Sequence, residues 1–241
     1  MRIVATTFMD GFFWNNFKSM EQDFLRFLEY TPYCVMNDEM YSPKLTGLLL
    51  QIGGYIDSAF KEMARFFTFT EVKSYKIKRG VLTEKLERKA VKDIIDYCAV
   101  FEGIYDLSNN SHGDLIAKLD FGLQHLRPFE KFAGAKSPEW WTAYNKVKHE
   151  YSAEFDRANI KNVLNGLAGA FLLNALHYPS IELLWKLGYL EAGSRVGETG
   201  FQNIMHHKGA FNEYMKVAVS NLSPLNLGIR IETPLFLYLR Q

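Results

Sequence analysis

The sequence predicts a mainly α-helical protein with a short extended or β element at its C-terminal end. Several long segments place apolar residues three and four positions apart, which gathers them on one face of a helix. Serine–proline pairs at residues 42–43 and 137–138 stand where two of these segments begin, and such pairs are typical of helix starts. Near the end of the chain the pattern changes to alternation at Ile229 and Ile231, which favours strands.

The first half of the chain contains three expected helices. The first covers residues 13–30, and Pro32 stops it. The second covers residues 42–67, although two adjacent glycines loosen its middle, and the third begins near Thr83. Residues 101–122 are rich in asparagine, serine and glycine, so they predict an exposed loop.

The second half contains the most apolar helix pattern. A helix over residues 153–177 is expected at the centre of a bundle, and small residues such as Gly166 along a second face let another helix come close. A further helix is expected over residues 180–190. After a glycine-rich linker near 190–200, residues 225–241 predict a short hairpin or an extended arm.

Composition excludes several classes of protein. The 241 residues carry 28 lysines and arginines against 27 aspartates and glutamates, so the net charge of +1 gives no global attraction to a polyanion. Two cysteines, Cys34 and Cys98, are too few for a disulfide framework and fit a reducing compartment, so a cytoplasmic location is expected. Neither a signal peptide nor a membrane-spanning helix is expected from the apolar runs.

Residues 137–151, SPEWWTAYNKVKHEY, combine helix and site signals. Ser137 is expected to cap the helix, with Pro138 in its first turn. One stripe of this helix is aromatic and apolar, while Asn145, Lys148 and His149 form a polar ledge beside it. The helix therefore predicts both a core face and an accessible polar face.

Three segments together resemble the HEPN-like helical domains of bacterial proteins. They are SPKLTGLLLQIGGYIDSAFKEMA, LRPFEKF and the long run that begins SPEWWTAYNKVKHEYSAEF, within residues 40–178. The resemblance implies an up-and-down bundle of four or five helices over residues 1–190, commonly dimeric, with residues 191–241 as an appendage packed on the same domain. A homodimer is therefore expected.

Nuclease members of this superfamily are metal-independent ribonucleases of toxin, phage-defence and RNA-processing systems. Their motif is an arginine, often followed by a polar residue, then a histidine after four to six positions. His149 matches the histidine and Asn145 the polar residue, but the positions allowed for the arginine hold Tyr144, Ala143 and Thr142. Metal-free RNA cleavage needs proton carriers and a cation for the phosphate, and a tyrosine cannot replace the arginine.

Two hypotheses follow. The favoured one is a non-catalytic module that binds RNA, another nucleic acid, a nucleotide or a protein partner; the alternative is a ribonuclease in which His149 is the acid or base, Asn145 assists it and another cation replaces the arginine. The candidate binding residues are Lys146, Lys148, Trp141, Tyr144 and Arg127, and Arg157 is a further possible cation. The plainer interpretations are that His149 is a structural residue, that the tryptophans form core, and that the lysines form a solvated face.

No metal and no cofactor are predicted. The adjacent histidines 206 and 207 diverge on a helix and have no carboxylate or cysteine at ligand spacing. The basic run at residues 73–79 could contact phosphates but is more typical of a surface loop. A small-molecule pocket is a third alternative, since Asn162, Asn165 and Asn174 lie along an apolar helix, where they could equally bond to each other.

Overall fold

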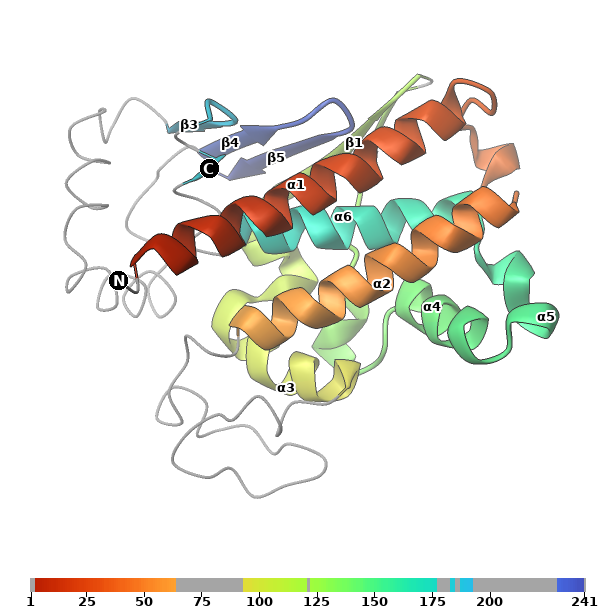
Figure 1. The fold of residues 1–241 in the computed structure, drawn as a ribbon, viewed down its shortest axis with the longest axis horizontal. Coiled ribbons are helices and arrows are strands. Elements are labelled where there is room, and N and C mark those ends of the chain that lie inside the picture. The colour runs from red at the N-terminus through yellow and green to blue at the C-terminus, as the bar shows by residue number, and fades with distance from the viewer. Residues whose placement is uncertain are drawn as a thin grey trace.

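The computed structural model describes residues 3–63, 93–120, 122–176, 183–184, 187–192 and 229–240, and it is mainly helical, as the sequence predicts (Figure 1). The α-helices are α1 (Ile3–Leu28), α2 (Pro43–Met63), α3 (Ile94–Tyr105), α4 (Glu139–His149), α5 (Tyr151–Glu154) and α6 (Ile160–Leu176). Short 3-10 helices are η1 (Val35–Asn37), η4 (Leu107–His112), η5 (Glu130–Gly134) and η6 (Phe155–Arg157). The strands are β1 (Asp114–Leu119), β2 (Gly122–His125), β3 (Leu190–Ala192), β4 (Ile229–Glu232) and β5 (Phe236–Arg240).

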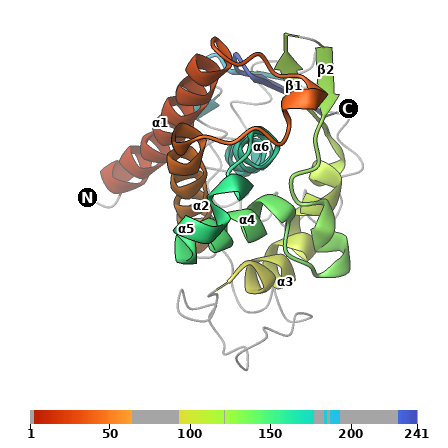
Figure 2. The same ribbon diagram turned by 90° about the vertical axis from the view of Figure 1, so that its right-hand side faces the viewer.

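Helix α6 lies at the centre of the fold. Figure 2 views it nearly along its axis, with α1 and α2 on one side, α4 below it and the strands above it. The predicted central helix is confirmed, but its expected start at residue 153 is wrong. Helix α6 begins only after Asn159, whose side-chain oxygen caps it by accepting a hydrogen bond from the N–H of Asn162, at 2.9 Å.

Close approach of the helices depends on two glycines. A Cβ atom at Gly166 of α6 would lie 3.0 Å from Cγ2 of Ile52 on α2. At Gly53 of α2 a Cβ would lie 2.3 Å from Cδ2 of Tyr144 on α4. The prediction that small residues of α6 admit a neighbouring helix is therefore confirmed, and α2 uses the same device toward α4.

A five-stranded antiparallel sheet covers one side of α6 in the described part of the chain, with strand order β2-β1-β5-β4-β3. The expected C-terminal extended element is confirmed as the β4–β5 hairpin. The exposed loop expected over residues 101–122 is wrong, because α3 continues to Tyr105 and β1 begins at Asp114, where it pairs with β5.

The turn-forming residues between α3 and β1 explain this error. Asn110, Ser111 and His112 adopt left-handed backbone angles, as their composition indicates, but the segment is folded inward. The buried Asn110 amide donates to the carbonyl of Leu126 at 2.8 Å, and the buried Ser111 hydroxyl donates to the carbonyl of Tyr105 at 2.6 Å. These two bonds attach the turn to neighbouring backbone carbonyls, although the side-chain oxygen of Asn110 is buried without a hydrogen-bond donor among the described residues.

The C-terminal hairpin is attached to α1 through a buried carboxylate. Glu21, 1% exposed, accepts hydrogen bonds from the Thr233 hydroxyl and from the N–H of Leu235, the latter at 3.1 Å, and pairs with Lys18 at 2.9 Å. A buried carboxylate without such donors would be costly, so these contacts specify where the hairpin sits. The expected division of the chain at residue 190 stays a prediction.

The predicted helix starts have mixed outcomes. The Ser42 hydroxyl accepts from the N–H of Leu45 at 3.2 Å, which confirms that cap, and α1 ends at Leu28, before Pro32. Residues 83–92 lie outside the described residues, so a helix start near Thr83 is not tested. The helix expected over residues 180–190 does not reach its predicted end, because residues 187 and 188 form a turn and Leu190 begins β3. Helix α3 begins at Ile94, because Asp93 has an extended backbone and its carboxylate caps the helix by accepting from two N–H groups of the first turn.

Candidate functional site

Helix α4 carries the residues that the sequence predicts as a site, and it begins differently from the prediction. Pro138, rather than Ser137, occupies the cap position, and no side chain caps the helix. The Ser137 hydroxyl lies 3.1 Å from the hydroxyl of Thr142 instead. The N–H groups of the first turn, from Glu139 to Trp141, therefore have no capping acceptor in the described structure and present a positive partial charge.

The aromatic residues of α4 belong to the core. Trp141 and Tyr144 are only 5% and 6% exposed, and their ring centroids lie 5.1 Å apart. Trp140 is also buried, and its indole N–H donates to the carbonyl of Pro128 at 2.7 Å. The covered rings cannot stack on a base in this structure, so the binding role predicted for Trp141 and Tyr144 is replaced by packing.

The cationic residues at the C-terminal end of α4 are largely committed to other groups. The ammonium of Lys146 lies 3.3 Å from the Glu150 carboxylate and 3.6 Å from that of Glu154. Arg157 also pairs with Glu154. The ammonium of Lys148 lies 5.4 Å from the ring centroid of Tyr144, within cation–π range.

His149 ends α4 on the surface, and Asn145 is half-buried one turn earlier. No described residue forms a hydrogen bond or an ion pair with the imidazole of His149. The histidine can carry a proton, but Lys146 and Arg157, two of the cations expected to support it, are neutralised by carboxylates. On this ledge, Lys148 is the cation whose ammonium forms no ion pair with a described residue, and it lies against the ring of Tyr144.

Arg127 lies at the opposite end of α4. It lines a cavity of about 200 Å³ together with residues from η5, from the first turn of α4 and from α6: Pro128, Glu130, Lys131, Pro138, Glu139, Trp140, Lys161, Asn162 and Asn165. Since a helix rises about 1.5 Å per residue, the ten steps from Glu139 to His149 separate the two ends by about 15 Å. The structure thus divides the predicted site residues between two places.

The cavity is unevenly charged. Lys131 lies 2.8 Å from one oxygen of the Glu139 carboxylate, and Lys161 lies 3.9 Å from the other. The hydrogen bond and the charge of Lys131 lower the pKa of Glu139 below its usual value. Arg127 is exposed, and no described residue forms an ion pair or a hydrogen bond with its guanidinium. Three cations against Glu130 and Glu139 leave a net positive lining.

Two asparagines complete the polar lining. The side-chain N–H groups of Asn162 and Asn165 donate to the carbonyls of Arg157 and Lys161, each at 2.9 Å. The amide oxygen and the second N–H of each side chain are therefore the groups that can meet a ligand. Neither of these bonds joins the asparagines to each other, so a polar pocket along this helix fits their contacts better than mutual pairing.

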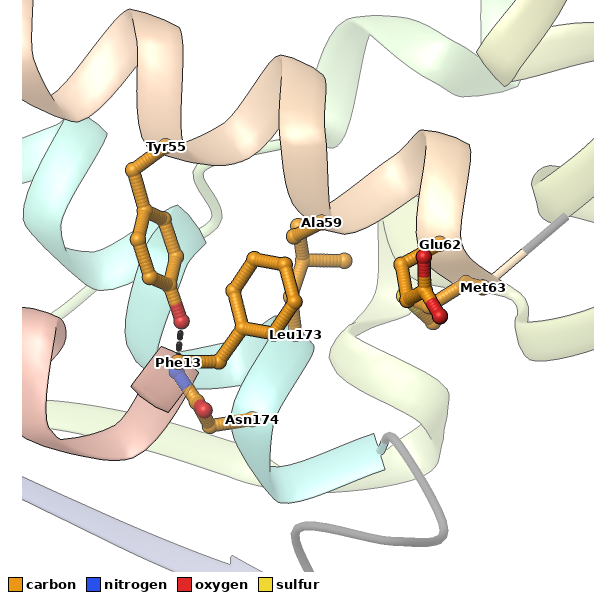
Figure 3. Close-up of a pocket in the computed structure, with 7 residues that line it drawn as sticks. All are labelled: Phe13, Tyr55, Ala59, Glu62, Met63, Leu173 and Asn174. Carbon is orange, nitrogen blue, oxygen red and sulfur yellow. Dashed lines mark hydrogen bonds between the residues drawn. The ribbon is translucent and has the colours of Figure 1, made fainter. Parts of the chain in front are cut away.

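Asn174 lines a different and much smaller cavity, shown in Figure 3. Its amide donates to the Tyr55 hydroxyl, and the cavity of about 10 Å³ lies between α2, α6 and Phe13 of α1. That volume is about one water molecule. Burial raises the pKa of Tyr55, although the bond from Asn174 opposes this. We assign this cavity no binding role.

Sequence reasoning singled out Arg127 but missed Lys131, Glu139, Lys161 and the cavity between them. The sequence contains no single motif for this cavity, because its residues come from three segments that only the packing of η5, α4 and α6 brings together. Across the described ranges no group of three or more histidine, cysteine, aspartate or glutamate residues is placed to hold a metal ion. The histidines 206 and 207 and the basic run at 73–79 lie outside those ranges.

Comparisons with protein-family models, with curated proteins and with solved structures found no match to this chain. The resemblance to HEPN-like domains and the expected homodimer therefore stay predictions. Of the helices that the structure describes, none is both long and apolar enough to cross a membrane.

Proposed function

We propose that this protein is a HEPN-like helical module that binds a phosphate group of RNA or of a nucleotide without cleaving it. The observation that carries the proposal is Arg127, an exposed cation with no described partner, on a cavity that also contains Lys131 and Lys161. The binding site is then at the N-terminal end of α4 rather than at the ledge of His149.

The chemistry of this lining favours phosphate. A guanidinium can hold two phosphate oxygens at once, and lysines add charge without a fixed geometry. The uncapped first turn of α4 contributes N–H groups and the positive end of the helix dipole to the same place. The amide oxygens of Asn162 and Asn165 supply acceptors for hydroxyl or amino groups next to the phosphate.

The size of the cavity limits how much of a ligand it encloses. Its volume of about 200 Å³ is about twenty times that of the cavity beside Asn174. Pockets that enclose a whole drug-sized ligand are larger, at about 300–1,000 Å³. The cavity therefore accommodates a phosphate with its sugar, while the base or the remaining strand stays outside.

Binding without cleavage is favoured over the ribonuclease alternative by the separation of the two ends of α4. A catalytic histidine needs the cation that stabilises the phosphate within the same site. The first turn of α4, which lines the cavity together with Arg127, lies about 15 Å from His149 along the helix, and Lys146 and Arg157 are paired with glutamates.

The test is binding of a short fluorescent oligoribonucleotide and of AMP to the purified chain in EDTA, followed by anisotropy and by calorimetry. Arg127→Ala is expected to weaken binding about tenfold, since a charge-assisted contact contributes about 1.5 kcal/mol. Lys136→Ala is the matched control, because this exposed lysine follows η5 but does not line the cavity.

The two ligands separate two sources of the phosphate. Tight binding of AMP indicates a nucleotide site, and binding of the oligoribonucleotide alone indicates an RNA site. Equal losses in both variants would mean only general electrostatic attraction and would overturn the proposal. Cleavage of the RNA by the wild-type chain, lost in His149→Ala, would establish the ribonuclease instead.

A further inference from the structure

The cavity beside α4 already contains an anionic group of the protein itself. The Glu139 carboxylate bridges Lys131, at 2.8 Å, and Lys161, at 3.9 Å. These are the cations that would otherwise be open to a phosphate. Glu139 therefore occupies two of the three positive charges, and only Arg127 is left without a described partner.

The Glu139 carboxylate can break its ion pairs with Lys131 and Lys161 without disturbing the core. The Glu139 side chain is 61% exposed, and Lys131 and Lys161 are almost half exposed, so all three can change rotamer at the surface. Glu130, the second carboxylate on the cavity, has no ion pair among the described residues. The lowered pKa of Glu139 agrees with a carboxylate that is held as an anion by Lys131.

We infer that Glu139 competes with the ligand for Lys131 and Lys161, so that the cavity selects a terminal phosphate monoester over an internal phosphodiester. A phosphodiester has one negative charge, and exchanging it for one carboxylate yields little electrostatic gain. A phosphate monoester has nearly two negative charges near neutral pH, so it can replace the carboxylate and still attract Arg127.

The ligand class is then a 5′- or 3′-phosphorylated RNA end or a mononucleotide. This inference rests on the proposed phosphate site and assigns Glu139 as a residue that determines its specificity. Glu139 is a positioning residue for the lysines, not a group that contacts the phosphate.

The experiment compares one short oligoribonucleotide carrying a 5′-phosphate with the same strand carrying a 5′-hydroxyl. The wild-type chain is expected to bind the phosphorylated strand about fivefold more tightly. The terminal monoester brings one more negative charge to the cavity than an internal phosphodiester does, and one charge about 4 Å from a cation in water-like surroundings contributes about 1 kcal/mol. In Glu139→Gln the hydroxyl strand is expected to bind more tightly, so that the preference shrinks to less than about twofold.

Glu130→Gln is the matched control, since it removes the same charge from the same cavity but releases no lysine. It is expected to keep the preference, even where both strands bind slightly better. Circular dichroism of each variant verifies folding.

Each result is decisive for a different claim. Equal binding of the two strands by the wild-type chain, or a preference unchanged in Glu139→Gln, would overturn this inference while the phosphate site stands. Failure of the wild-type chain to bind either strand or AMP would remove the proposed function and the inference together.

Discussion

Replacing Gly53 with alanine is expected to destabilise the protein, because this glycine lets α2 approach Tyr144. The new Cβ would lie 2.3 Å from Cδ2 and 2.4 Å from Cε2 of the Tyr144 ring. Ordinary carbon contacts are about 3.5–4.0 Å, so the ring would have to move by at least about 1.2 Å. The ring is buried against Trp141 and has little room for such a shift.

The magnitude follows from two opposing contributions. Overpacking of this kind costs about 1–3 kcal/mol or more, and a clash with an aromatic ring belongs at the upper end. Alanine gains about 1 kcal/mol over glycine inside a helix. The net loss in the free energy of unfolding is therefore about 2 kcal/mol for Gly53→Ala.

The adjacent glycine provides the control. Gly54 lies in the same helix, is exposed, and its added Cβ would meet no atom within 4 Å. Gly54→Ala is expected to stabilise the protein by up to about 1 kcal/mol. Urea unfolding followed by circular dichroism measures both variants, and the difference between them is expected to be about 3 kcal/mol.

The reasoning is refuted if Gly53→Ala proves as stable as Gly54→Ala. A second cycle in a Tyr144→Ala background locates the cause. There the penalty of the Gly53 substitution is expected to vanish, because the atoms that the new methyl group would overlap are gone. A penalty that persists without the ring would assign it to another contact.

Three further predictions concern buried groups. Trp140→Phe leaves the buried carbonyl of Pro128 without its donor, and urea unfolding is expected to show a loss about 1–3 kcal/mol greater than for Trp141→Phe, whose indole N–H has no acceptor among the described residues. Glu21→Ala removes the acceptor of the C-terminal hairpin and is expected to increase amide hydrogen exchange in β4 and β5 by at least about tenfold; unchanged exchange would contradict the attachment. Burial raises the pKa of Cys98 to about 12, so at pH 8 only about 10⁻⁴ of its side chain is thiolate. Iodoacetamide is therefore expected to modify the half-buried Cys34 faster than Cys98 as long as the chain is folded, and mass spectrometry of the labelled protein measures this.

Helix α4 was only partly predictable from periodicity and motif. The helix of residues 139–149 was predictable from its apolar spacing and its proline, but its cap was not, because Ser137 prefers Thr142 to the first-turn N–H groups. The buried ring of Tyr144 occupies a position where the motif would place an arginine, and its depth depends on Gly53 of another helix.

The sheet was only half predictable for a similar reason. Alternation near residue 230 signals strands by itself, whereas the short apolar run of β1 follows a polar turn that is usual in exposed loops. That turn is buried, and its Asn110 and Ser111 side chains donate to the carbonyls of Leu126 and Tyr105, respectively, contacts that local composition does not encode.

The sequence by itself determined the helical class, the central apolar helix and the starts of α2 and α4, because these depend on interactions between residues a few positions apart. Only the tertiary structure decided which charges are committed. Lys146 is neutralised by carboxylates that follow it, while Arg127, Lys131 and Lys161 meet across a cavity formed by three separate segments. Charge acts through distance in space, and for these residues the packing of η5, α4 and α6 sets that distance.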